Sequence, residues 1–137
     1  MNVKVDLQEN LKFNAQGKSG HNMPMDASES AGGDDSAPKP LEMMLAGLGG
    51  CTGIDVVLIL RKMKAEIEDF NIDIEAERAE EHPKRYEKIH LNYYIKGKNL
   101  DERKVEKAID LSENKYCSAS ASLNAEITSS YEIENIE

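Results

Sequence analysis

The sequence predicts an α+β fold in the order βββ-α-ββ-α-β. Residues 3–7 and 70–77 alternate apolar and polar side chains, as strands with one solvent-exposed face do. Residues 40–64 form a long, mostly apolar stretch that favours a buried central helix, and residues 101–114 favour a second, amphipathic helix. The pattern contains no internal repeat, so residues 1–137 are expected to form a single domain.

The first part of the chain is expected to form three short strands and a loop. Residues 3–7 and 11–15 flank a Glu-Asn pair and can fold back on each other as a hairpin, and residues 21–26 supply a third strand. Between residues 27 and 39 the composition changes to Ser, Gly, Asp and Pro. This composition predicts a mobile surface loop.

The central helix is expected to begin at Pro40, because proline suits the first helical position. Basic residues at 61, 62 and 64 lie at its C-terminal end, where the helix dipole favours them. Each interior glycine costs about 1 kcal/mol relative to alanine. The helix contains four such glycines, Gly47, Gly49, Gly50 and Gly53. Close approach of another backbone or of a ligand beside Cys51 would explain their presence.

The second part of the chain is expected to form two paired strands, a helix and a closing strand. Asp101 can cap the second helix, whose inner face carries Val105, Ala108 and Ile109. A run of small residues then follows Cys117 and leads into the last strand. The expected ranges are strand 70–77, turn 80–84, strand 89–97, helix 101–114 and strand 123–133.

Composition excludes several classes of partner. Asp and Glu number 26 against 17 Lys and Arg, and the net charge of −9 disfavours binding to nucleic acid or to an anionic membrane surface. The first residues lack the apolar core of a signal peptide, so a cytoplasmic location is expected. Residues 43–60 approach the length of a membrane span, but Asp55 and the glycines favour a buried helix. In a reducing compartment a transient disulfide is more plausible than a permanent one.

Most catalytic motifs are absent. No glycine-rich phosphate loop and no serine nucleophile elbow occur. His21, His82 and His90 lack ligand spacing with one another or with the two cysteines, so no metal site is expected. The remaining candidates are the two cysteines, Cys51 and Cys117.

Cys51 needs a cation if it is to be a nucleophile. Glu42 precedes it by nine positions, about two and a half helical turns, and lies on approximately the same face. A carboxylate alone disfavours a nearby thiolate, so Lys18 or His21 is the candidate for the offsetting cation. From the residues alone, Cys51 is either a reactive thiol or a buried structural one.

Three segments resemble the OsmC/Ohr superfamily, most closely its YhfA-like branch: Pro40-Leu41-Glu42, Gly49-Gly50-Cys51-Thr52-Gly53-Ile54-Asp55-Val56-Val57 and Lys115-Tyr116-Cys117-Ser118. The resemblance implies an intertwined homodimer with two central helices and surrounding antiparallel sheets. It also implies that Cys51 attacks an organic hydroperoxide and that Cys117 resolves the sulfenic acid to a disulfide. An external dithiol would then restore the thiols without a bound cofactor.

The sequence departs from the hydroperoxide reductases of this superfamily in two places. Their carboxylate, ten residues before the reactive cysteine, falls here on Leu41, with Glu42 one position later. No arginine precedes Arg61, and Lys18 in the equivalent turn lacks the bidentate fork of arginine. We therefore expect Cys51 to be slower with peroxides than in those enzymes, yet more reactive than Cys117.

Two functions thus remain open. The first is thiol-dependent hydroperoxide reduction by Cys51 and Cys117. The second is a non-catalytic dimeric protein that binds a small apolar ligand and buries both cysteines. Both include a homodimer, because an apolar helix of this length leaves more apolar surface than so small a chain can cover.

Overall fold

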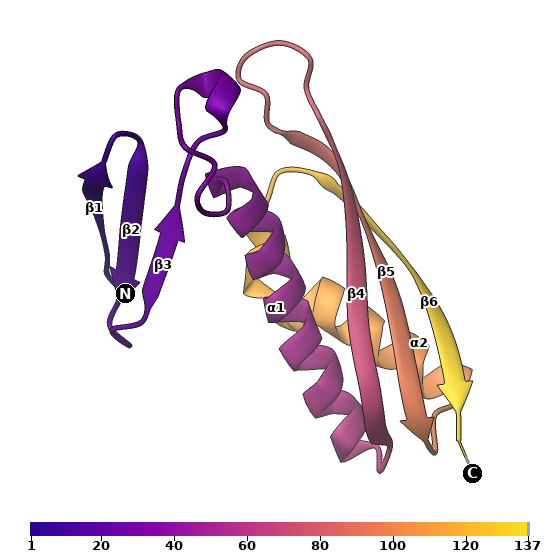
Figure 1. Ribbon diagram of the computed structural model, residues 1–137. Helices are drawn as coiled ribbons and strands as arrows, with labels where there is room; N and C mark the ends of the chain where they lie inside the picture. The colour runs from indigo at the N-terminus through magenta and orange to yellow at the C-terminus, as the bar shows by residue number, and fades with distance from the viewer. Residues whose placement is uncertain (137) are drawn as a thin grey trace. The chain divides into compact units, whose positions relative to one another are not determined.

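The computed structural model describes residues 1–136, which fall into two compact units, 1–46 and 47 onward. Helix α1 (Pro40–Lys62) begins in the first unit and continues in the second (Figure 1). The element order confirms the predicted α+β class. The single-domain organisation stays a prediction.

The first unit contains a three-stranded antiparallel sheet in the order β1-β2-β3. Its strands are β1 (Val3–Glu9), β2 (Lys12–Gly17) and β3 (Asn22–Met25), and all three match predicted strands to within a few residues. Leu7 of β1 pairs with Phe13 of β2, so the alternating apolar side chains of the two strands stand on one face. The predicted hairpin is confirmed.

The loop after β3 contains local structure that its composition does not predict. It contains a short 3₁₀ helix, η1 (Glu29–Ala31), and it closes around the carboxylate of Asp26, which is only 2% exposed. Asp26 accepts hydrogen bonds from the backbone N–H groups of Ala27, Asp34 and Ser36, at 2.7, 3.3 and 3.1 Å, and from the Ser36 hydroxyl at 2.8 Å. The predicted loop is therefore present, with a buried aspartate supplying acceptors that a loop otherwise takes from water, and its mobility stays a prediction.

The second unit is built on a three-stranded sheet in the order β4-β5-β6. Strands β4 (Glu66–Arg78) and β5 (Tyr86–Lys98) are antiparallel, as predicted, but β6 (Glu126–Asn135) runs parallel to β5. The expectation of purely antiparallel sheets is wrong here. The helical segment between β5 and β6 returns the chain to the start of β5, and only such a long crossover permits parallel pairing.

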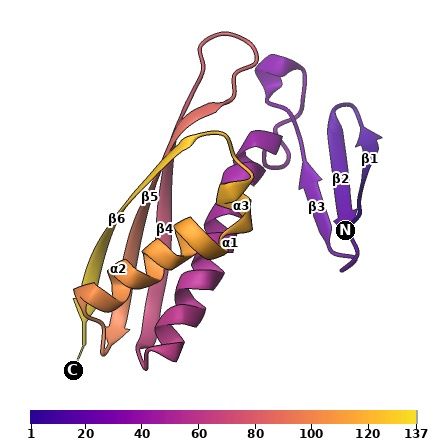
Figure 2. The same cartoon turned by 180° about the vertical axis from the view of Figure 1, so that it is seen from behind.

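Helices α1 and α2 (Glu102–Leu111) cover the same face of this sheet (Figures 1 and 2). Alternate residues of β5 point toward them and are buried, which explains the period-two pattern of that strand. The core of the unit consists of Leu48, Val56 and Leu60 from α1, Ile89, Leu91, Tyr93 and Ile95 from β5, and Val105, Ala108 and Ile109 from α2.

Helix α1 buries one face rather than its whole surface. Ile54 and Leu58 are 64% and 48% exposed, so the expectation of a buried helix is met only on the side toward the sheet. A Cβ atom on Gly49 would lie 2.8 Å from Ile74 Cδ1, whereas Gly50 has open space. The close approach at Gly49 is thus to a strand side chain, not to a backbone or ligand.

By length and composition α1 could also cross a membrane, but core helices of soluble proteins meet the same criterion.

Helix α2 begins as predicted but the segment after it differs. Asp101 caps the helix, its carboxylate accepting from the Lys104 N–H at 2.9 Å. The helix then widens into a π-helix, η2 (Ser112–Tyr116), and Cys117 caps a further helical turn, α3 (Ser118–Ala121). The small residues after Cys117, which were expected to lead into the last strand, first form this helical turn, and the strand β6 follows it.

Candidate functional site

The structure brings Cys51 and Cys117 together. Their Sγ atoms and a carboxylate oxygen of Asp55 all lie within 4.8 Å of one another, and both cysteines are free thiols. Cys51, on α1, is half-buried, whereas Cys117 is only 3% exposed. The two thiols therefore share one site and differ in their access to solvent.

The backbone around Cys117 fixes the position of its thiol. The Cys117 N–H donates to the Ser112 carbonyl at 2.7 Å and so closes the π-helical turn. Its Sγ accepts the N–H of Ser120 at 3.4 Å, in the position of a helix cap. Burial raises the pKa of the Cys117 thiol, and the Ser120 hydrogen bond only partly offsets this. Cys117 is thus a protonated, well-positioned thiol at neutral pH.

Asp55 completes the cluster, and sequence analysis did not identify it as a site residue. It follows Cys51 by four positions on α1, so the two side chains stand one turn apart on the same face. The Ser112 hydroxyl donates to Asp55 Oδ2 at 3.1 Å and orients the carboxylate. The spacing on a predicted helix could have paired Asp55 with Cys51, but only the fold shows that Cys117 reaches both.

A chain of buried hydroxyl groups extends from Asp55 across the core. Thr52 Oγ1 lies 2.8 Å from Ser112 Oγ and 2.9 Å from the Tyr93 hydroxyl, and that hydroxyl lies 3.4 Å from Glu113 Oε1. Burial raises the pKa of both Tyr93 and Glu113. These hydrogen bonds link α1, β5 and η2 through polar contacts inside an otherwise apolar core, and their end at Ser112 contacts both Asp55 and the backbone of Cys117.

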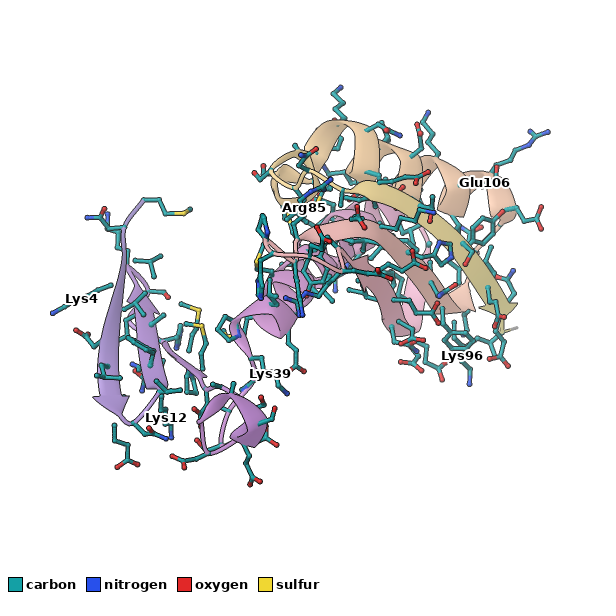
Figure 3. All side chains as sticks on the ribbon, turned by 90° about the horizontal axis from the view of Figure 1, so that it is seen from above. Lys4, Lys12, Lys39, Arg85, Lys96 and Glu106 are labelled. Atoms are coloured by element: carbon teal, nitrogen blue, oxygen red, sulfur yellow. The ribbon has the colours of Figure 1, made fainter. Side chains whose placement is uncertain are left out.

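The predicted residues Glu42, Lys18 and His21 all lie in the first unit. Glu42 is in the first turn of α1, where its carboxylate accepts the Lys39 N–H at 3.2 Å and lies 3.7 Å from Lys39 Nζ. Lys39 precedes α1 and is labelled in Figure 3. Lys18 lies in the turn between β2 and β3, His21 just before β3, and both are exposed. Their participation in catalysis stays a prediction, and Glu42 already has a cation beside it.

The cluster supports two kinds of chemistry. An S–S bond is about 2 Å long, so the two sulfurs, now at most 4.8 Å apart, must move closer to form a disulfide. Two sulfurs and a carboxylate oxygen are also close enough to share one metal ion. In the part of the chain that the structure describes, no lysine or arginine forms an ion pair with Asp55.

Comparison with known proteins agrees with this architecture. Residues 33–132 match the family model described as OsmC-like protein. The chain is 38% identical over 135 residues to Protein YhfA of Escherichia coli strain K12, and the match covers 97% of this chain and 98% of that protein.

Solved structures of other proteins have the same fold as this chain. The crystal structure of a hypothetical protein from Aquifex aeolicus VF5 superimposes with a TM-score of 0.80 at 30% identity, covering 98% of this chain and 97% of that one. The organic hydroperoxide resistance protein OhrB of Bacillus subtilis shares the fold at 16% identity, with a TM-score of 0.63 and coverage of 96% and 98%. From the family model and the near-full-length similarity to YhfA, we conclude that this chain belongs to the OsmC-like protein family.

Proposed function

We propose that this protein reduces organic hydroperoxides through Cys51 and Cys117. The observation that carries the proposal is the pair of free thiols whose sulfur atoms lie within 4.8 Å of each other. Their different burial suits two different roles. Cys51, the more accessible thiol, is the attacking group, and Cys117 resolves the product.

The reaction balances with one external reductant. The Cys51 sulfur attacks the terminal oxygen of the hydroperoxide, the O–O bond breaks, and the alcohol leaves with the thiol proton, so that Cys51 becomes a sulfenic acid. The Cys117 sulfur then attacks the Cys51 sulfur, a disulfide forms and water leaves. An external dithiol reduces the disulfide by two exchange steps and returns both thiols. Asp55 lies close enough to relay the thiol proton to the departing alkoxide, and a cation beside the site is still required to offset its charge.

Family membership adds support at the level of fold. OhrB of Bacillus subtilis, which has the same fold, is described as an organic hydroperoxide resistance protein. That likeness alone does not transfer an activity, because one fold serves many functions. The thiol pair within this chain is the feature that connects the fold to hydroperoxide chemistry.

The active form in this proposal is a homodimer joined along α1. The helix presents an exposed stripe in which Gly47 and Gly50 have open space beside them and Ile54 and Leu58 are exposed. Glycines followed by large apolar residues at helical spacing allow close approach of a second helix. An isologous pair of α1 helices would cover this stripe on both copies at once.

Thiol counting tests the reaction. Reduced wild-type protein is expected to lose two thiols per chain on addition of cumene hydroperoxide, faster than with hydrogen peroxide, and a lipoyl-type dithiol should then support turnover. Cys117→Ser should stop at a sulfenic acid that a dimedone probe captures. Cys51→Ser should show no turnover, and turnover in that variant would refute the mechanism.

Lys18→Arg should raise turnover if Lys18 supplies the activating cation.

One observation favours a second candidate function, the binding of a small apolar ligand. The first unit contains a pocket of about 420 Å³ with an almost wholly apolar lining. Its walls consist of Val5, Leu11, Phe13, Met25, Asp26, Ala27 and Pro40. Displacement of an apolar fluorescent probe by fatty acids or alkyl alcohols, unaffected by Cys51→Ser, would support this function. A probe that does not bind would exclude it.

A further inference from the structure

We propose that Cys51, Asp55 and Cys117 form a binding site for one thiophilic divalent cation, with Zn²⁺ as the natural occupant. The three candidate ligand atoms all lie within 4.8 Å of one another. Thiolate sulfur and carboxylate oxygen are both common zinc ligands. The site does not depend on hydroperoxide reduction, so each proposal can fail without the other.

The geometry is close to what zinc requires. With Zn–S bonds of about 2.3 Å, tetrahedral coordination places two sulfurs about 3.8 Å apart and a sulfur and an oxygen about 3.5 Å apart. The upper limit of 4.8 Å for the present separations leaves at most about 1.0 Å of closure between the two sulfurs and about 1.3 Å between a sulfur and the oxygen. Rotation of the Cys51 and Asp55 side chains on α1 can supply that closure without movement of the backbone.

The ligands come from two fixed elements. Cys51 and Asp55 are one turn apart on α1, the same spacing that places two ligands on one face of a helix in many metalloproteins. Cys117 lies at the junction of η2 and α3, where its backbone N–H is bonded to Ser112 and its Sγ accepts from Ser120. A preformed arrangement of this kind lowers the entropy cost of binding an ion.

A second layer of contacts orients the carboxylate. The fully buried Ser112 donates its hydroxyl to one oxygen of Asp55, and Thr52 contacts Ser112 in turn. Outer contacts of this kind hold a metal-binding carboxylate in place, and their loss typically weakens metal affinity about 10- to 100-fold. A carboxylate oxygen has two lone pairs, so Asp55 can accept from Ser112 and bind the ion at the same time.

Three protein ligands leave the fourth tetrahedral position for water or for a small ligand. On binding, Zn²⁺ displaces one proton from each thiol and forms two Zn–S bonds and one Zn–O bond. The sulfurs are then unavailable to an oxidant, and conversely a Cys51–Cys117 disulfide cannot hold the ion. Metal binding and thiol oxidation are therefore mutually exclusive at this site.

Cobalt substitution tests the site on the reduced, full-length protein. We expect one Co²⁺ per chain, an S-to-Co charge-transfer band in the near ultraviolet, and visible bands of tetrahedral intensity that equimolar Zn²⁺ removes. Cys51→Ser and Cys117→Ser should each reduce the charge-transfer band, and Asp55→Asn should weaken binding about tenfold or more. Asp73→Asn, an exposed aspartate on β4, is the matched control and should bind as the wild type does.

A measurement on the unmodified chain guards against variants that fold poorly. Zn²⁺ should slow the alkylation of Cys51, and a chelator should restore the rate. The absence of both the cobalt bands and this protection would overturn the site. Wild-type affinity in a folded Asp55→Asn protein, checked by circular dichroism, would overturn the assignment of three ligands.

Discussion

The two thiols differ in environment, and this difference predicts the order in which they react. Cys117 is 3% exposed and burial raises its pKa, so at neutral pH it is protonated and shielded. The thiolate is the form that alkylating reagents attack. We expect iodoacetamide at neutral pH to modify Cys51 first, and peptide mapping by mass spectrometry to find Cys117 modified only after unfolding. Equal rates at the two positions would contradict the assigned roles.

A second prediction at this scale concerns Asp26. The Ser36 backbone N–H, followed by the Ser36 hydroxyl, lowers the pKa of this carboxyl below its usual value of 3.8. A lowered pKa means that the ionised form stabilises the folded state. The contribution is complete above the unfolded pKa and is lost as the pH falls through the lowered folded value. Asp26→Asn should therefore lower the melting temperature at pH 7, and the difference from wild type should shrink below about pH 4.

A calorimetric series from pH 2 to pH 7 measures this effect. Asp34→Asn, which changes a neighbouring exposed aspartate in the same loop, is the control and should show no such convergence. A gap between Asp26→Asn and wild type that stays constant to pH 2 would refute the role of the ionised carboxylate.

Residue types indicated part of the site, and the fold was needed for the rest. Cys51 and Cys117 were identified from their sequence contexts, and the structure places them together. Asp55 and Ser112 were missed, since one looked like a charge inside an apolar helix and the other like an ordinary polar residue at a helix end. Their function depends on the contact between Asp55 on α1 and Ser112 on η2, which are 57 positions apart in the sequence, so no local pattern contains it.

At the scale of elements, the contact between α1 and β4 gives a double-mutant prediction. A Cβ atom on Gly49 would lie 2.8 Å from Ile74 Cδ1, while one on Gly50 would meet nothing within 4 Å. Alanine favours the helix by about 1 kcal/mol at either glycine, but crowding at Gly49 should cancel that gain. Removing the crowding atom with Ile74→Val should make Gly49→Ala about 1 kcal/mol more favourable than it is in wild type.

Chemical denaturation of the four proteins in this cycle measures the coupling. The same cycle with Gly50→Ala in place of Gly49→Ala is the control, and its coupling should be near zero whatever the sign of the single effect. A Gly49 coupling indistinguishable from that of Gly50 would show that α1 and β4 do not pack as described.

The sequence was sufficient to predict the type of nearly every element, because type follows from local period. Alternation identified β4 and β5, and Asp101 marked the start of α2. The direction of β6 could not be predicted in this way, since an alternating strand has the same pattern whether its neighbour is parallel or antiparallel. The π-helix at η2 was also missed, because one turn of wider helix has no characteristic composition.

For the whole molecule, the exposed stripe on α1 predicts assembly. A homodimer should have twice the chain mass of 15.3 kDa in sedimentation or light scattering. Ile54→Glu places a charge in the proposed interface and should give a monomer, because burying an unpaired carboxylate is costly. Asn71→Glu, on an exposed position of β4, should leave the dimer intact. A wild-type monomer at micromolar concentration would exclude the proposed interface.

The buried hydroxyl groups between Asp55 and Glu113 couple the protonation of one end of the series to the direction of the hydrogen bonds along it. Thr52, Tyr93 and Ser112 bring three protons to the four contacts that link Glu113 to Asp55. If both carboxylates are ionised, there is one proton too few, and one of the four oxygen–oxygen contacts has no hydrogen between its two atoms. Burial raises the pKa of Glu113, while the hydrogen bonds that it accepts from Ser129 and Tyr93 act in the opposite direction. Tyr93 donates to Glu113 while that carboxyl is ionised, and protonation of Glu113 frees the Tyr93 hydroxyl to donate to Thr52 instead, so a proton gained or lost at Glu113 changes the direction of hydrogen bonds inside the core without any backbone movement.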